Sequence, residues 1–204
     1  MQDRSILIQA ISARICHDFA GPIGAVDNCV DLLAHQEKWV QDQAKDIIMD
    51  EAKSLISNVR LFRFIFGVHQ GEQEIFLEQI QAHYNDLIKS SVAKIDLDLK
   101  KAGNVFNVEI VKAIFCIIKV ELERLYKKSD KLNITLEKEL ITIQINSDSL
   151  SKKNSISDLL KNPDNEITPH NCREHYVLML IAEGNYNLEI KSDDNTRKYI
   201  ISQK

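Results

Sequence analysis

One histidine stands where the neighbouring residues suit chemistry on its ring. His17 is followed directly by Asp18 and, five positions on, by Pro22. A neutral imidazole is a good nucleophile near neutral pH, and a nearby carboxylate can hold the proton on one ring nitrogen while the other nitrogen reacts. The pattern therefore favours a reaction in which His17 attacks an electrophile and Asp18 assists it.

The helical neighbours of His17 are small. A single long helix is predicted here because apolar residues recur at spacings of three or four from Ile8 to Leu33. Gly costs roughly 1 kcal/mol and Pro roughly 3 kcal/mol relative to Ala inside a helix, so helix stability alone does not explain their presence. Pro22 is expected to bend or loosen the helix near Asp18. The small residues around the ring form a shelf that suits close approach by another folded domain. The neighbours of His17 at three, four and seven positions along the helix are Ala10, Ala13, Arg14, Ala20, Gly21 and Gly24.

Simpler interpretations of the same residues stay open. A histidine beside an aspartate on a helix is most often solvated surface. Asp18 lies four residues after Arg14, a spacing typical of a helical ion pair worth a few tenths of a kcal/mol. Pro22 can be a structural kink. The coincidence of all these features within one helix favours a functional site.

Two stretches resemble a known family. His17-Asp18-x-x-x-Pro22 resembles the phospho-accepting box of histidine kinases. The longer run over residues 13–18, 21–26, 28 and 31–33 resembles the ChpT-type histidine phosphotransferases of alphaproteobacterial phosphorelays. A second match, Arg60-Leu61-x-Arg63-Phe64-x-Phe66-Gly67, ends the next helix. The resemblance implies a dimeric helical domain that carries the histidine, followed by a degenerate ATPase-like domain.

Composition narrows the class of protein. The 204 residues are 44% hydrophobic with a net charge of -4. The chain therefore has no excess of positive charge that would indicate binding to nucleic acid. The sequence shows no signal peptide and no apolar run long enough to span a membrane, and we expect a cytoplasmic protein with no membrane partner. The sequence contains no C-x-x-C pair that would suggest a metal site. Its cysteines are isolated, at Cys16, Cys29, Cys116 and Cys172.

An antiparallel helical hairpin is predicted for residues 1–70. The first helix covers about residues 4–35, and a short polar link returns the second helix, which ends at the glycine cap Gly67. Apolar residues extend around both helices at Leu7, Ile47, Leu61 and Ile65. Two hairpins pairing into a four-helix bundle would bury this surface, so we predict a homodimer. The alternative is that it packs on the chain's own C-terminal domain.

Residues 71–204 are predicted to form a second domain, which makes the fold class α+β. The hinge is placed at residues 69–72. Beyond it the pattern indicates a helix at 73–90, a strand at 93–99, a helix at 106–126 and strands at 132–138 and 140–147. A polar segment follows at 148–168, then a helix from Pro169 to Gly184 and a last hairpin. This order is similar to the ATP-binding domain of histidine kinases.

The sequence argues against a working nucleotide site in that domain. Such sites use an asparagine on a helix to hold magnesium and glycine-rich loops to approach phosphates. No asparagine occurs between Val108 and Leu132, where Cys116 and Val120 take the expected places, and no glycine occurs between Gly103 and Gly184. We expect neither ATPase nor autokinase activity, and no cofactor or metal bound by this chain.

The resulting mechanism is phosphoryl transfer between proteins. His17, through Nε2, would take a phosphoryl group from the aspartate of a receiver domain and pass it to a second receiver, with Mg expected on the receiver. Asp18 would orient or assist His17, provided that a bend or side-chain movement brings it near. Arg14 is a possible phosphoryl contact. The predicted docking residues are Ala13, Ala20, Gly21, Pro22, Gly24, Asn28, Arg60 and Arg63.

The resemblance implies particular partners: a CckA-like hybrid kinase receiver as donor and CtrA-like and CpdR-like response regulators of the cell cycle as acceptors. Two other functions stay open. An active histidine kinase would label itself from ATP. A dimeric scaffold with no phosphoryl chemistry would leave the relay flux unchanged after His17→Ala and lose partner binding after Gly21→Leu.

Overall fold

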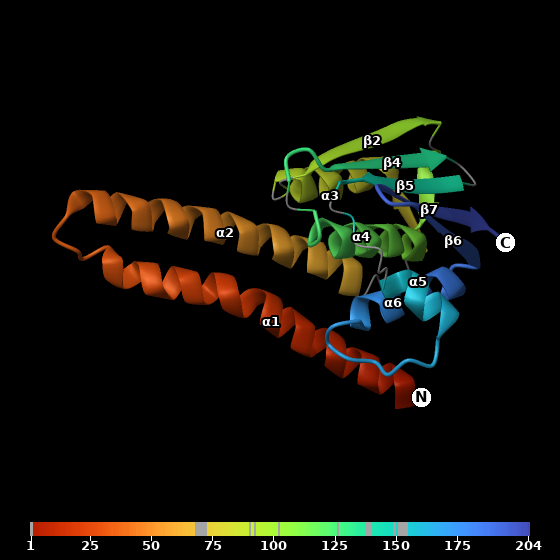
Figure 1. Cartoon of the computed structure of the whole chain (residues 1–204), viewed down its shortest axis with the longest axis horizontal. Coiled ribbons are helices and arrows are strands. Elements are labelled where there is room, and N and C mark those ends of the chain that lie inside the picture. The colour runs from red at the N-terminus through yellow and green to blue at the C-terminus, as the bar shows by residue number, and fades with distance from the viewer. Residues whose placement is uncertain are drawn as a thin grey trace.

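Two long antiparallel helices project from a compact sheet domain (Figure 1). In the computed structural model, α1 spans Gln2–Leu32 and α2 spans Lys38–Phe66. The helix α1 runs without interruption through Pro22. It ends three residues earlier than predicted, because the amides of residues 33–35 bond to carbonyls only three positions back. The structure describes residues 2–67, 73–89, 91, 93–101, 103–125, 127–137, 140–148, 150 and 155–204.

Helix α2 ends where predicted, but for a different physical reason. Gly67 has a φ of -72°, so it does not form a left-handed cap. A Cβ at this position would instead collide with the backbone carbonyl oxygen of Arg63. Glycine is therefore required by the close approach of the chain to the end of its own helix. The predicted hinge at residues 69–72 and the domain boundary at residue 70 lie outside the described residues.

The C-terminal domain is a five-stranded mixed sheet with strand order β2-β4-β5-β7-β6. Only β2 and β4 pair in parallel, and the other neighbours are antiparallel. The sheet and its last hairpin agree with the prediction, and the fold class α+β is confirmed. The strands are β2 (Lys94–Lys101), β4 (Lys131–Glu137), β5 (Leu140–Asn146), β6 (Tyr186–Ser192) and β7 (Thr196–Gln203).

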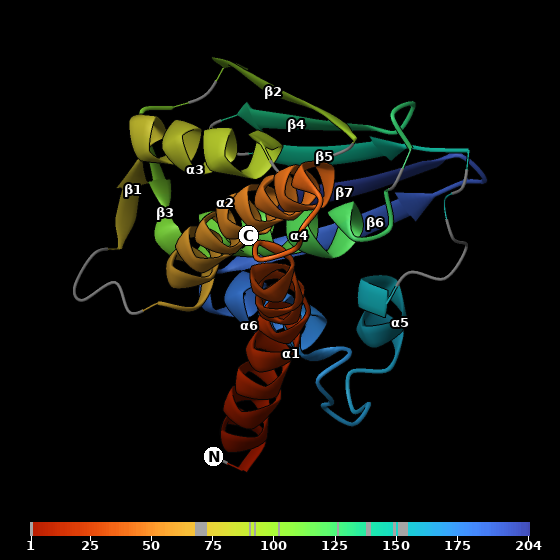
Figure 2. The same cartoon turned by 90° about the vertical axis from the view of Figure 1, so that its left-hand side faces the viewer.

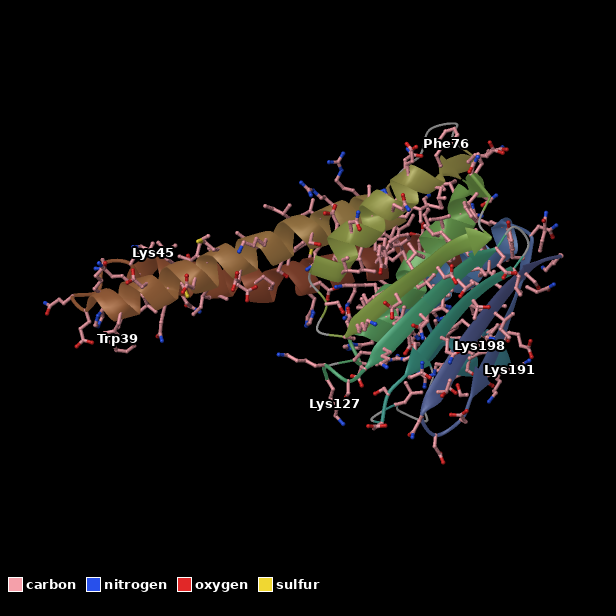
Figure 3. The ribbon with its side chains drawn as sticks, turned by 90° about the horizontal axis from the view of Figure 1, so that it is seen from above. Trp39, Lys45, Phe76, Lys127, Lys191 and Lys198 are labelled. Atoms are coloured by element: carbon pink, nitrogen blue, oxygen red, sulfur yellow. The ribbon has the colours of Figure 1, made fainter. Side chains whose placement is uncertain are left out.

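Helices cover one face of this sheet (Figure 2). They are α3 (Leu77–Lys89), α4 (Val108–Leu122) and α6 (Cys172–Glu183). Alternate residues of the central strands point to them, including the fully buried Leu132, Ile143 and Tyr199. The opposite face carries polar side chains, among them Lys191 and Lys198 (Figure 3). Helix α4 is buried along nearly its whole length, as its apolar sequence predicts.

Three short elements were not predicted. Strands β1 (Glu74–Phe76) and β3 (Val105–Asn107) pair in a separate two-stranded sheet, so the predicted helix at 73–90 was wrong over its first residues. The burial of Ile75 opposite Phe106 explains this, since tertiary packing outweighs local propensity. Helix α5 (Ser155–Lys161) lies in the predicted polar segment; its seven residues are too few for a readable periodicity.

The base of the hairpin packs tightly on the C-terminal domain. Leu7 clusters with Cys172 of α6, while Leu61 and Ile65 join the main core of the sheet domain. The Tyr176 hydroxyl of α6 donates a hydrogen bond of 2.9 Å to the Ile65 carbonyl. The alternative considered for the extra apolar surface therefore holds for these three hairpin residues, whereas Ile47 stays 45% exposed.

Candidate functional site

The His17 imidazole is uncovered on α1. Its side chain is 79% exposed. Ala13, Ala20 and Gly21 beside it are also exposed, and a Cβ built on Gly21 or Gly24 meets no atom within 4 Å. Ala13, Ala20 and Gly21 of the predicted shelf are thus open surface, with room for another molecule to approach the ring. Ala10 is instead buried, in a cluster with Cys172 of α6.

Asp18 lies beside His17 without forming a hydrogen bond to it. The distance from His17 Nδ1 to Asp18 Oδ1 is 3.6 Å, beyond hydrogen-bond range but within that of an ion pair once the ring is protonated. The Asp18 side chain is only 14% exposed. The carboxylate therefore lies on the buried side of the ring, next to Nδ1. Nε2 is the ring nitrogen farther from this carboxylate.

Arg14 points toward the C-terminal domain. Its Nε lies 2.9 Å from Asp18 Oδ1, which is the helical ion pair considered from the sequence. Its Nη2 lies 3.1 Å from Glu123 Oε2, just after α4. Because the Arg14 side chain is only 18% exposed, its pair with Asp18 is more strongly shielded from water than a typical surface pair.

A second arginine completes an ion-pair network between the domains. Arg173, in the first turn of α6, binds Glu123 with two hydrogen bonds of 2.6 Å. Its Nη1 also lies 4.0 Å from Asp18 Oδ2. Burial would raise the pKa of the Glu123 carboxyl, but the hydrogen bonds and charge of Arg173 outweigh this and hold that pKa below its ordinary value. Arg14, Asp18, Glu123 and Arg173 are called the interdomain network below.

Sequence reasoning missed Glu123 and Arg173. Their link to α1 spans more than a hundred positions, as the separation of 109 between Arg14 and Glu123 shows. One local signal was available. A cation in the first turn of a helix opposes the helix dipole, so Arg173 needed an acidic partner elsewhere.

The remaining predicted docking residues lie at two places. Asn28 is exposed on α1, and Pro22 is half-buried there. Arg60 and Arg63 instead line a groove of about 580 Å³ between α2 and α3. Arg60 also lies 3.4 Å from Asp86 of α3.

The places expected for magnesium-binding asparagines lie inside the core. Cys116 and Val120 of α4 are 0% and 2% exposed. Burial raises the pKa of the Cys116 thiol, as expected for an inert core cysteine. Between α3, α4 and the sheet, apolar side chains leave a cavity of only about 10 Å³. Within the described ranges, no cluster of three or more His, Cys, Asp or Glu side chains is placed to hold a metal, and no helix is long and apolar enough to cross a membrane.

Comparison with solved structures decides the fold. A structure described as a bacterial phosphotransferase superposes with a TM-score of 0.82 at 19% identity, covering 96% of this chain and 95% of that one. The chain has the fold of a bacterial phosphotransferase. The histidine kinase ThkA, solved in complex with the response regulator TrrA, superposes with a TM-score of 0.53 at 13% identity, covering 98% of this chain and 62% of that one. No protein-family model and no curated protein sequence matches the chain.

Proposed function

We propose that this protein is a histidine phosphotransferase of a multistep phosphorelay. The observation that carries the proposal is the exposed His17 ring, with a shielded carboxylate beside Nδ1 and open small residues around it. The fold, shared with a bacterial phosphotransferase, supports the same class of reaction.

In the proposed step, Nε2 of His17 attacks the phosphorus of a receiver's aspartyl phosphate. The N–P bond forms as the P–O bond to the receiver carboxylate breaks, and that carboxylate leaves with the electron pair. The proton stays on Nδ1, where Asp18 stabilises the cationic ring. Transfer to the second receiver reverses these events. The receiver supplies the Mg that neutralises the phosphoryl oxygens.

Arg14 fits a supporting role better than direct contact with the phosphoryl group. Its guanidinium is engaged by Asp18 and Glu123 on the protein side of α1. In the proposal it holds the Asp18 carboxylate in place. Contact with the transferring oxygens would require it to leave both partners.

The C-terminal domain is proposed to act without nucleotide. The helix that would carry magnesium-binding asparagines presents Cys116 and Val120 to the core, and the sequence lacks glycines from 104 to 183. Incubation with labelled ATP tests this directly. We expect no label on the protein, whereas label on His17 would make it an active histidine kinase.

A homodimer is proposed from the part of the hairpin that projects beyond the C-terminal domain. Ile23 and Val30 on α1 are spaced by seven residues, as are Met49 and Ile56 on α2, and all four are more than half exposed. Such repeats give each helix an apolar stripe. A second copy would cover both stripes by forming a four-helix bundle.

Receiver domains are the proposed partners. The ThkA structure with a similar fold was solved with a response regulator, which supports partners of this class. CckA-like donors and CtrA-like or CpdR-like acceptors remain the specific candidates implied by the family resemblance.

The test of the proposed function is incubation with a phosphorylated receiver. We expect acid-labile phosphate on the wild-type protein and none on His17→Ala. His170→Ala removes an exposed imidazole from the C-terminal domain and should leave labelling intact. An unlabelled wild-type protein, or equal labelling of His17→Ala, would contradict the proposal.

A further inference from the structure

We propose that Arg173 and Glu123 of the C-terminal domain are positioning residues for phosphoryl transfer at His17, acting through Asp18. This inference rests on the proposed function and deepens it. It assigns the C-terminal domain a part in the chemistry itself, through the interdomain network.

Asp18 is held from two sides. Arg14 reaches Oδ1 from the preceding turn of α1, at 2.9 Å. Arg173 approaches Oδ2 from α6, at 4.0 Å. Oδ2 is buried and forms no hydrogen bond to any described residue, so the charges of the two arginines are what compensate its loss of water. Removal of Arg173 would take away one of the two guanidinium groups beside the Asp18 carboxylate.

Arg173 is itself firmly placed. Its side chain is 6% exposed, and both terminal nitrogens bind the Glu123 carboxylate in a bidentate pair. Its backbone carbonyl lies 3.6 Å from the Cys116 thiol of α4. Near it, Cys172 packs on Leu7 and Ala10 of α1. The guanidinium is therefore fixed relative to the helix that carries His17.

The network links this geometry to the reaction. When Asp18 stays beside Nδ1, the ring keeps its proton on that nitrogen and presents the Nε2 lone pair outward. When the ring becomes cationic during transfer, the same carboxylate offsets the charge. An Asp18 side chain released by loss of Arg173 could rotate away from the ring, and both effects would weaken. The docking surface around Gly21 would stay unchanged.

Single-turnover transfer from a phosphorylated receiver tests the inference. For Arg173→Ala we expect the maximal rate to fall about tenfold, while the half-saturating receiver concentration stays within about twofold. Glu123→Gln should show the same pattern to a smaller degree, because Arg14 and Arg173 lose a shared anchor. Arg173→Lys should recover only part of the rate, since an ammonium cannot form the bidentate pair that the Arg173 guanidinium makes with Glu123.

Arg4→Ala is the matched control. Arg4 also bridges the two domains, by a pair of 2.7 Å to Glu183, but its side chain is 74% exposed and it lies outside the network. We expect transfer within about twofold of wild type. An equal loss of rate in Arg4→Ala and Arg173→Ala would mean that any weakening of the interface slows transfer, and would overturn the inference.

A second readout needs no phosphoryl group. Nitrogen chemical shifts of the His17 ring in the neutral form report its tautomer. We expect the Nδ1–H form to be enriched in wild type and to decrease in Arg173→Ala. Thermal unfolding curves check that both proteins are folded. An unchanged tautomer and an unchanged maximal rate would reject the inference while leaving the proposed function intact. Absence of transfer in wild type would reject both.

Discussion

The hairpin and the C-terminal domain differ in how far they bury their side chains. The hairpin leaves apolar residues such as Ile23 and Ile56 more than half exposed, together with the His17 ring. The C-terminal domain buries nearly all of α4, including a carboxylate at Glu121. Figure 3 shows Trp39 at the far tip of the hairpin, well away from the sheet. The contrast teaches that, among the described residues, most of the exposed large apolar side chains lie on the hairpin, while α4 and the strands of the second domain form a filled core.

The largest expected effect breaks that support. Glu121 is fully buried and accepts hydrogen bonds from Arg197, at 3.0 and 3.1 Å, and from the Tyr199 hydroxyl. Glu121→Ala would leave a buried guanidinium without its anion, so we expect a loss of about 3–5 kcal/mol in the free energy of unfolding. Chemical denaturation measures it.

Glu189→Ala is the control for this change. Its pair with Lys191 lies on β6 with both side chains more than half exposed, and its removal should cost at most about 0.5 kcal/mol. Similar losses for Glu121→Ala and Glu189→Ala would show that the core does not depend on the buried pair.

The next effect concerns the apolar stripes of the hairpin. Ile56→Asp places a charge on the surface proposed to pair with a second copy, and we expect the dimer dissociation constant to rise about 100-fold or more. Sedimentation of the two proteins measures it. Ile88→Asp, at an exposed position on α3 outside the hairpin, should sediment with the same mass as the wild-type dimer. A wild-type protein that stays monomeric at high concentration would contradict the dimer.

A smaller effect is expected on the shelf beside His17. A Cβ built on Gly21 meets no atom within 4 Å, so we expect the fold to tolerate Gly21→Leu. A docked receiver would meet the new side chain, and we expect transfer to fall about tenfold or more. Ser12→Leu, half a turn round the exposed helix from Gly21, should transfer normally. Equal transfer by both variants would mean that receivers do not dock on the shelf.

The smallest effect is the pH dependence of the interdomain network. The pKa of Glu123 is lowered in the folded protein, so its contribution to stability is present above its ordinary value of 4.5 and is lost as the pH falls through the folded-state pKa. We expect Glu123→Gln to melt a few degrees below wild type at neutral pH, and the difference to shrink below about pH 4.5. A constant difference in melting temperature across this range would contradict the assignment.

The sequence predicted what depends on local pattern. The two long helices, the alternating strands around Ile95 and Ile143, and the open neighbours of His17 all follow from residue spacing. The interdomain network does not, because Arg14 meets Glu123 across 109 positions and Arg173 meets it across 50. The pairing of Ile75 with Phe106 was missed for the same reason. Contacts between distant segments are set by tertiary packing, which periodicity does not describe.

The most direct test is to locate the phosphoryl group after the protein has reacted with a phosphorylated receiver. Phosphorus NMR distinguishes the two phosphohistidine isomers from aspartyl phosphate. We predict a single phosphohistidine signal of the Nε2 isomer, which is absent from His17→Ala. Phosphate on an aspartate, on Nδ1, or on a histidine other than His17 would contradict the account.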